Sequence, residues 1–280
     1  MNGRLKRTLA LTAVGVVLVI YLLPIYWIVA TSFKEYGDIL ARPPRFLFVP
    51  TLRNYAALFL LPGQGLQATP FAARLLNSVI IASFSTVLAI ALGTMTAYAF
   101  SRFRTRGQSD WLFFILSTRM LPPVVVVIPV FLMYRALGLF DTHVGLIMLY
   151  TAFNVSFAVW LLKGFMDEIP KEYEEAALVD GYSRLQAFVR VVLPQAVAGI
   201  AATSVFCLIS AWNEFAFALV LTQRTAQTAP PYIPSVVGSG ATEWGRIAAG
   251  TVAFLLPVAI FTFIMRKHLL RGATFGALKR

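Results

Sequence analysis

Residues 77–100 read NSVIIASFSTVLAIALGTMTAYAF and contain no charged side chain. An α-helix rises about 1.5 Å per residue, so about 20 apolar residues cross the hydrocarbon core of a bilayer. A charge at the centre of that core is costly, and spanning segments therefore exclude charges. We predict that residues 77–100 cross a membrane as a helix.

Similar apolar segments lie on either side of this one. The six predicted spans cover about residues 9–33, 77–100, 111–137, 144–165, 199–222 and 247–265. The first is too long for a signal peptide and lacks a small-residue cleavage site, so we expect it to be retained. Only 13% of the residues are charged, about half the share in a soluble domain. The expected fold is all-α: a polytopic membrane protein with six transmembrane helices in a single domain, residues 1–280.

The positive charges indicate how these spans are oriented. With the N-terminus inside, 15 Lys and Arg residues fall on the cytoplasmic side and 8 fall outside, while Arg119 lies within a span. Lys and Arg accumulate in cytoplasmic loops, and an even number of spans places both termini on one side. We therefore expect both termini in the cytoplasm.

Composition excludes several classes of function. The formal net charge of +12 follows from this positive-inside pattern, so we expect no nucleic-acid partner. The single cysteine, Cys207, lies in an apolar segment, and the two histidines, His143 and His268, are far apart in the chain. This set forms no disulfide framework or metal-ligand pattern, so we expect no metal site. No G-x-x-x-x-G-K-[ST] loop occurs, so we do not expect the chain to bind nucleotide phosphates itself.

Residues 166–198, which we call the acidic loop, contain six of the twelve acids in the chain. Pro170 and the acids after it are typical of a first helical turn, and Gly181 is typical of the position that follows a helix. Ser183 is a good N-cap for a second helix, which we expect to end at Pro194. The acidic loop is therefore predicted to be two short helices joined by a glycine corner.

The local pattern of the acidic loop leaves two interpretations open. One is an amphipathic helix on the membrane surface, but such helices usually carry Lys and Arg on their polar face. Anionic headgroups would repel an acidic helix. That repulsion favours the second interpretation, in which the helix docks into a basic groove on another protein.

The acidic loop is similar to a known motif. Residues 174–194 read EEAALVDGYSRLQAFVRVVLP and resemble the EAA loop of bacterial binding-protein-dependent importers. The matching positions are Glu175, Ala176, Ala177, Gly181, Val191, Leu193 and Pro194, with Val191 where isoleucine is commoner. Further matches are Leu52-x-Asn54-Tyr55, Trp212-Asn213-Glu214 and the ending RGATFGALK at residues 271–279. Over essentially its whole length the chain resembles the carbohydrate importer permeases of the maltose-transporter type, specifically the shorter, six-span subunit.

This resemblance implies an ABC type I importer permease that forms half of the pathway for a sugar, a sugar alcohol or a related polyhydroxylated solute. The implied partners are a cytoplasmic ABC ATPase dimer, a second homologous permease, an extracytoplasmic solute-binding protein and the lipid bilayer of a bacterial inner membrane. The ATPase would bind ATP and Mg²⁺, so this chain would hold no cofactor and would not be an enzyme.

In the family, the EAA loop is a coupling helix that sits in a groove of the ATPase. The resemblance implies that Glu175 meets a basic groove residue, that Ala176 and Ala177 allow close seating, and that Gly181 forms the corner. The remaining residues expected to take part in coupling are Asp180, Leu193 and Pro194. In the family, the loop that corresponds to residues 223–250 reaches towards the solute-binding protein, which implies the same role here. From the sequence alone, this segment is a proline-stiffened loop, and most such loops are connectors.

Polar residues inside predicted spans are candidates for the passage, because hydrocarbon disfavours them. Trp212-Asn213-Glu214 either lines the passage and binds solute hydroxyls, or clamps this chain to the companion permease. A third interpretation is that Glu214 is a neutral, protonated acid. Arg119 lies beside Pro122 and Pro123, and we expect it to satisfy carbonyls that these prolines leave free. The alternatives are gating and a counter-charge for an anion. Asn154 faces either the passage or another helix.

Two other classes of membrane protein are weighed against the importer. An ATP-independent secondary transporter predicts an internal repeat with interrupted helices in matching halves, whereas the acidic loop occurs once. A membrane-embedded enzyme requires a nucleophile, a base or a metal set in facing spans. Two distant histidines and one cysteine provide no such set.

Overall fold

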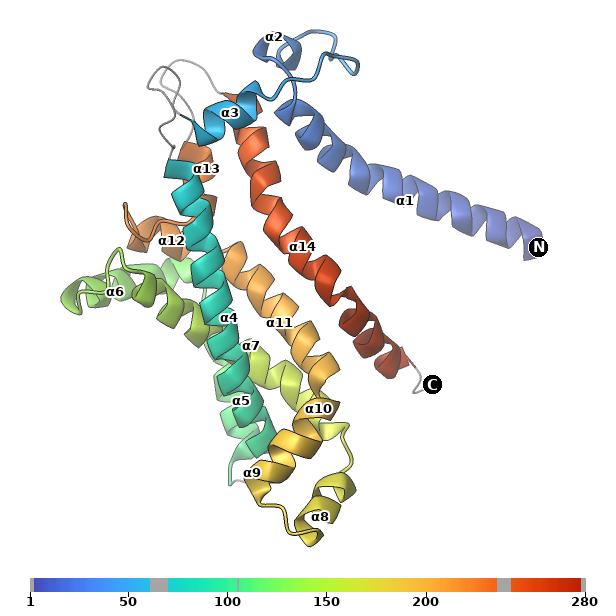
Figure 1. Ribbon diagram of the computed structural model, residues 1–280, viewed down its shortest axis with the longest axis vertical. Helices are drawn as coiled ribbons and strands as arrows, with labels where there is room; N and C mark the ends of the chain where they lie inside the picture. The colour runs from blue at the N-terminus through green and yellow to red at the C-terminus, as the bar shows by residue number, and fades with distance from the viewer. Residues whose placement is uncertain (1–2, 61–69, 105, 236–242, 278–280) are drawn as a thin grey trace. The chain divides into compact units, whose positions relative to one another are not determined.

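The computed structural model describes residues 3–60, 70–104, 106–235 and 243–277, and their side chains except those of residues 3–6, 235 and 268–277. Each regular element in these ranges is a helix (Figure 1). The chain divides into two compact units, residues 1–73 with 232–256 and residues 74–231 with 257–280. The predicted ending at residues 271–279 is helical through Ala277, and its last two residues lie outside the described ranges.

The first unit is organised around the end of α1 (Gly3–Ser32). It also contains α2 (Tyr36–Ile39), α3 (Arg53–Phe59) and the first half of α14 (Trp244–Ala277). The side-chain amide of Asn54, from the predicted Leu52-x-Asn54-Tyr55 motif, donates to the carbonyl oxygens of Ser32 (3.0 Å) and Lys34 (2.8 Å). The last carbonyls of a helix have no partner within it, so Asn54 serves as the cap of α1.

The second unit contains most of the remaining helices. They are α4 (Pro70–Arg102), α5 (Gln108–Ser117), the 3-10 turn η1 (Thr118–Met120), α6 (Pro123–Ala136), α7 (His143–Asp167), α8 (Glu172–Val179), α9 (Arg184–Ala187), the π-helical turn η2 (Phe188–Val192), α10 (Leu193–Gln195), α11 (Val197–Trp212), α12 (Ala216–Leu221) and the start of α13 (Ala229–Ser235). Within this unit α7 packs against α11, and α4 contacts α7 at Gly93. Helices α8, α9 and α10 gather at one end (Figure 1).

Helices α4 and α7 pack closely through small residues. Ala89, Gly93 and Ala97 lie one turn apart on α4, and all three are buried. A Cβ atom on Gly93 would lie 2.6 Å from the Cβ of Ala158 on α7. Small residues let helix backbones approach each other in membranes, where close packing replaces the hydrophobic effect as the force between helices.

Replacing Gly93 with valine should therefore force α4 and α7 apart. Overpacking a close contact costs about 1–3 kcal/mol, so we expect Gly93→Val to lower the midpoint of thermal unfolding of the detergent-purified protein. The matched control is Gly164→Val on α7, where an added Cβ meets nothing within 4 Å. Equal unfolding midpoints for the two variants would contradict this account of the packing.

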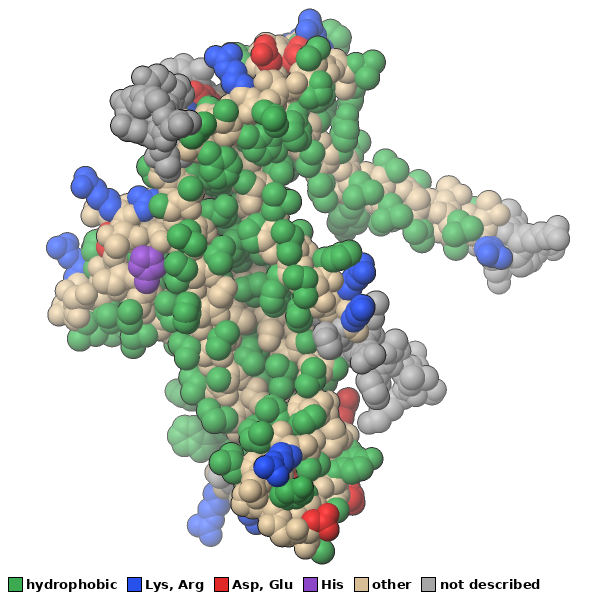
Figure 2. Space-filling view, viewed as in Figure 1, with side chains coloured by type: hydrophobic (Ala, Val, Ile, Leu, Met, Phe, Trp, Pro, Cys, Tyr) green, Lys and Arg blue, Asp and Glu red, His purple; other side chains and the backbone are tan. Residues whose placement is uncertain are grey.

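Four helices are long and apolar enough to cross a membrane: Arg7–Ser32, Pro70–Arg102, His143–Asp167 and Trp244–Lys267. Two bent pairs bring the number to six if each pair is one span. These pairs are Gln108–Met120 with Pro123–Ala136, bent by 90°, and Arg184–Gln195 with Val197–Trp212, bent by 74°. Hydrophobic side chains cover most of the visible surface along these helices (Figure 2). The protein is thus an all-α, polytopic membrane protein.

The predicted spans at 111–137 and 199–222 differ from the observed helices. The first is interrupted at Leu121 and Pro122, because consecutive prolines remove backbone donors. The second stops at Trp212, and α12 begins only at Ala216. The expectation that Pro194 ends its helix is also wrong. Pro194 lies in α10, directly after the wider turn η2, and the chain remains helical through Gln195.

Candidate functional site

The acidic loop folds into short helices around a glycine corner. Gly181 has φ +87°, and its N–H donates to the carbonyl of Leu178 (3.1 Å) while Tyr182 N–H donates to that of Ala177 (3.0 Å). These two bonds form a Schellman motif, whose left-handed position favours glycine. Ser183 Oγ then accepts from the N–H of Gln186 (3.3 Å), and the Gln186 side chain accepts from the N–H of Ser183 (2.8 Å), a capping box at the start of α9.

Most of the predicted coupling residues lie on the exposed side of this loop. They are Glu175, Ala176, Asp180, Gly181 and Pro194, while Leu193 is half-buried. The expectation for Ala177 is wrong, because this residue is only 5% exposed and faces its own chain. Of the two alanines, only Ala176 is exposed. Large apolar side chains flank it on the exposed side, with Tyr173 55% and Val179 87% exposed.

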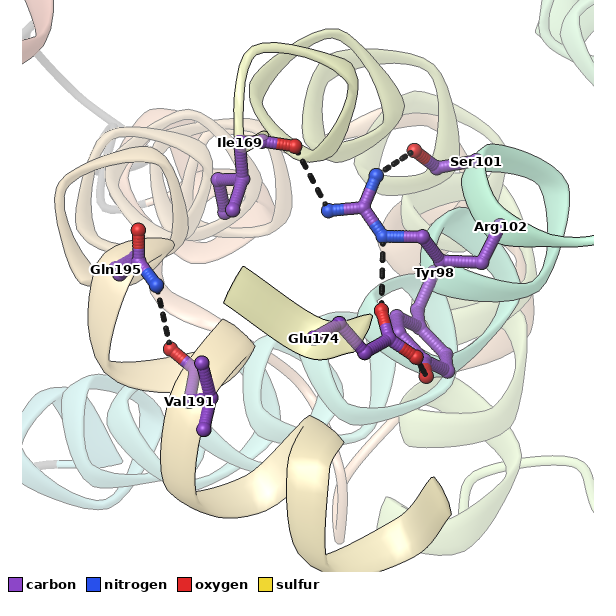
Figure 3. Close-up of polar contacts among 7 residues, drawn as sticks. All are labelled: Tyr98, Ser101, Arg102, Ile169, Glu174, Val191 and Gln195. Atoms are coloured by element: carbon purple, nitrogen blue, oxygen red, sulfur yellow. Dashed lines mark hydrogen bonds and ion pairs between the residues drawn. The ribbon is translucent and has the colours of Figure 1, made fainter. Parts of the chain in front are cut away.

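Glu174, which sequence reasoning did not single out, anchors α8 from the opposite side (Figure 3). One carboxylate oxygen accepts from the Nε of Arg102 on α4 (3.0 Å), and the other accepts from the hydroxyl of Tyr98. The side chains of Arg102 and Glu174 are 5% and 7% exposed. Arg102 also donates to the carbonyl of Ile169 (3.0 Å), just before α8. No local pattern indicates this contact, because Glu174 is 72 residues from Arg102 in the chain.

Arg119 and Asn154 form a polar layer between three helical elements. Arg119, in η1, donates to the carbonyl of Phe153 (3.0 Å) and to Asn154 Oδ1 (3.2 Å) on α7, and to Ser210 Oγ on α11 (2.8 Å). The Asn154 amide donates in turn to the Cys207 carbonyl on α11 (3.2 Å). The expectation that Arg119 satisfies carbonyls freed by Pro122 and Pro123 is wrong, because its acceptors belong to α7 and α11.

Glu214 caps α12 at the interruption after α11. Its carboxylate accepts from the backbone N–H groups of Phe217 (2.9 Å) and Ala218 (3.0 Å) and from the hydroxyl of Tyr150 on α7 (2.7 Å). A carboxylate suits the N-terminal end of a helix, where N–H groups have no partner within the helix. In this way an acid inside a predicted span is satisfied by its own chain.

The structure brings three of the predicted passage residues together around one cavity. Its volume is about 170 Å³, and its lining residues are Arg119, Leu121, Pro123, Tyr150, Phe153, Asn154, Ser210, Ala211, Glu214 and Phe217. Trp212 and Asn213 are not among them: Trp212 is 4% exposed, and the Asn213 amide donates to the Ile209 carbonyl (2.9 Å). In the described parts of the chain, no three His, Cys, Asp or Glu side chains gather so as to hold a metal ion.

Asp141, in the connection between α6 and α7, binds the backbone of residues 223–226. This contact was not predicted from the sequence. The Asp141 carboxylate accepts from four consecutive backbone N–H groups, those of Gln223, Arg224, Thr225 and Ala226, at 3.0–3.1 Å. Burial raises the pKa of Asp141, but the four donors outweigh burial and hold this pKa below its ordinary value.

Asn77 fixes the same segment from α4. Its amide donates to the carbonyls of Thr225 (2.8 Å) and Gln227 (2.9 Å). Its Oδ1 lies 2.8 Å from His143 Nε2. The Asn77 nitrogen is the donor to both carbonyls, so the oxygen of the same amide is the atom that faces His143.

Asp141→Asn is expected to loosen residues 223–227, because an amide places a donor against N–H groups that need an acceptor. The stabilising contribution of a depressed pKa is present above the ordinary carboxyl value and is lost as pH falls through the folded value. The loosening should therefore be visible at neutral pH, as faster amide hydrogen exchange in this segment. Asp110→Asn, at an exposed position on α5, is the control. Unchanged exchange in Asp141→Asn would contradict the role of the carboxylate.

Comparison with known proteins gives the chain a family. Residues 89–273 match the family "Binding-protein-dependent transport system inner membrane component". The chain is 35% identical to the trehalose transport system permease protein SugB of Mycobacterium tuberculosis, with 92% of each chain covered. It is 32% identical to the trehalose/maltose transport system permease protein MalG of Thermococcus litoralis, with 98% of each covered.

A solved structure shares the fold. A chain in the crystal structure of a bacterial ABC transporter involved in the import of the acidic polysaccharide alginate superposes with a TM-score of 0.77 at 23% identity. The match covers 95% of this chain and 97% of that one. The helical architecture is therefore that of an ABC importer permease, which transports and leaves ATP hydrolysis to a separate subunit. The chain belongs to the family of binding-protein-dependent inner-membrane transport components.

Proposed function

We propose that this chain forms half of the translocation pathway of an importer for a sugar, a sugar alcohol or a related polyhydroxylated solute. Two relatives whose names state trehalose or maltose as their solute support this solute class. The proposed assembly contains a second homologous permease, a cytoplasmic ATPase dimer that binds ATP and Mg²⁺, and an extracytoplasmic solute-binding protein. Both termini of this chain lie in the cytoplasm, on the side that holds most of the Lys and Arg residues.

The observation that carries this proposal is the arrangement of α8. Its exposed face presents Glu175 and Ala176, while the adjacent Glu174 is buried against α4. An exposed acid beside a small residue suits a basic groove on a protein partner, and the buried contact prevents α8 from moving independently of the spans. We assign the exposed face of α8, with the corner at Gly181, as the docking surface for the ATPase.

We assign the cavity around Arg119, Asn154 and Glu214 to the passage. It combines charged and amide groups with the apolar walls of Phe153 and Phe217. Small-molecule sites commonly join apolar surface with a few fixed polar groups of this kind. On the outer side, the segment at residues 223–227, held by Asp141 and Asn77, is the proposed platform for the solute-binding protein.

Co-purification tests the docking proposal. The chain is tagged and co-expressed with its genomic neighbours, and we expect an ATPase to purify with it. Glu175→Arg should abolish capture of the ATPase because it places positive charge against a basic groove. Gly181→Trp should also abolish capture, because a bulky residue is strained at φ +87°.

The matched control is Asp110→Arg, the same charge reversal at an exposed acid of α5, and it should leave capture intact. Equal capture by the parent, Glu175→Arg and Asp110→Arg would reject α8 as the docking surface. Solute uptake by this chain alone in vesicles without ATP would reject the importer and favour a secondary transporter.

A further inference from the structure

The ion pair between Glu174 and Arg102 joins α8 to α4 at a point where the chain provides no covalent link. Residue 174 lies in the first turn of α8, and residue 102 is the last residue of α4. Figure 3 shows the Arg102 guanidinium between the Glu174 carboxylate and the Ile169 carbonyl, with Tyr98 on the other carboxylate oxygen. One arginine thus holds both α8 and the residue that leads into it.

This polar contact is enclosed by apolar packing. The ring centroids of Tyr98 and Phe188, in η2, are 4.4 Å apart. Tyr98 also belongs to a buried cluster with Met166, Ile169 and Val192. Low dielectric strengthens a buried ion pair, and removing one partner leaves an uncompensated buried charge. The contact is therefore stiff: α8 cannot shift relative to the end of α4 without breaking it.

The covalent connections of α8 are less suited to transmit movement. The N-terminal connection passes through Pro170, and the C-terminal one is the turn at Gly181. Turns change direction by rotating a few backbone dihedral angles, as hinges do. A displacement of α8 is better transmitted by side-chain bonds to a long helix. Helix α4, which carries Arg102, is 33 residues long.

We propose that Arg102 is the positioning residue through which movement of α8 reaches α4, with Glu174 as its partner on α8. This inference rests on the proposed function, in which the ATPase moves α8. The adjacent acids then have separate tasks. Glu175 meets the ATPase, and Glu174 passes the displacement to the first long helix of the second unit. The residues that transmit movement to the translocation pathway therefore include the Tyr98–Arg102 end of α4 as well as the EAA loop.

The test measures amide hydrogen exchange in α8 and α4, because a change in the contacts of a helix changes the protection of its amides. The complex of permeases and ATPase is measured without nucleotide and after trapping with Mg-ATP and orthovanadate. In the parent we expect exchange to change both in α8 and at residues 95–102 of α4. Glu174→Gln removes the charge but keeps the side-chain shape. In this variant the change in α8 should persist, and the change in α4 should be lost.

Two further variants separate transmission from folding. Tyr98→Phe keeps the ion pair and should retain the change in α4. Asp167→Asn breaks the more exposed ion pair between Lys163 and Asp167, both on α7, and should also retain it. The result overturns the inference if α4 responds in Glu174→Gln as in the parent. It is also overturned if Glu174→Gln loses the α8 and α4 responses together, which would mean that the contact only supports the fold. A parent chain that captures no ATPase overturns the proposed function itself, and this outcome is visible before any variant is made.

Discussion

Glu214→Ala is expected to destabilise the folded permease by about 3 kcal/mol or more. The substitution leaves the N–H groups of Phe217 and Ala218 and the hydroxyl of Tyr150 without the acceptor that they share. An unsatisfied buried polar group costs about 1–3 kcal/mol, and hydrocarbon offers no water to replace the lost bond. We expect α12 to detach from α7 at this end.

Thermal unfolding of the detergent-purified protein measures the effect. The neighbouring substitution Asn213→Ala is the control, because the Asn213 side chain is exposed and bonds only to a carbonyl of its own helix among the contacts described. Glu214→Gln should fall between the parent and Glu214→Ala, since an amide oxygen can replace one of the two acceptor atoms. An unfolding midpoint for Glu214→Ala equal to that of Asn213→Ala would show that the cap contributes nothing.

Arg119→Leu is expected to reduce solute uptake by about tenfold or more, equal to about 1.4 kcal/mol in the barrier, while changing stability little. The charged side chain costs roughly 3 kcal/mol inside a membrane, and leucine removes this cost. Against that, the three hydrogen bonds that join η1 to α7 and α11 are lost, at about 1 kcal/mol each. The two contributions nearly cancel in stability, but the wall of the cavity loses its fixed geometry.

The measurement is uptake into vesicles that contain the whole complex, alongside the unfolding midpoint. Arg135→Leu, an exposed arginine on the neighbouring α6, should leave both quantities unchanged. Uptake at the parental rate by Arg119→Leu would remove Arg119 from the passage. If stability and uptake both fall strongly in Arg119→Leu, Arg119 is instead a structural residue.

Local features of the fold were predictable from the sequence, and distant contacts were not. The corner at Gly181 and the capping box at Ser183 depend on residues within a few positions of each other, so their pattern is visible in the chain. Glu174 is one of several acids in a row, and its partners Arg102 and Tyr98 lie 72 and 76 residues away in the chain. Nothing in the local pattern separates it from Glu175.

The interruptions of the predicted spans were partly visible. Pro122 and Pro123 mark the break before α6, but no proline or glycine marks the break at Asn213 to Phe215. Hydropathy continues across that break, because apolar residues lie on both sides of it. At this break Glu214 accepts from the first backbone N–H groups of α12, so a new helix starts there. The same carboxylate accepts from Tyr150, which is distant in the chain. Tertiary contacts thus override the helical pattern at the candidate site itself.

The bonds to Asp141 also constrain the order in which this protein is built during synthesis. The donors to its carboxylate come from residues 82 to 85 positions later in the chain. When α6 and α7 have entered the bilayer, these four donors have not yet been synthesised. The Asp141 carboxylate and the Asn77 amide nitrogen therefore remain hydrated until α11 and α12 have been inserted. Closing this side of the second unit is consequently a late step of biogenesis, and a chain that stops after α12 would insert its helices but leave that step undone.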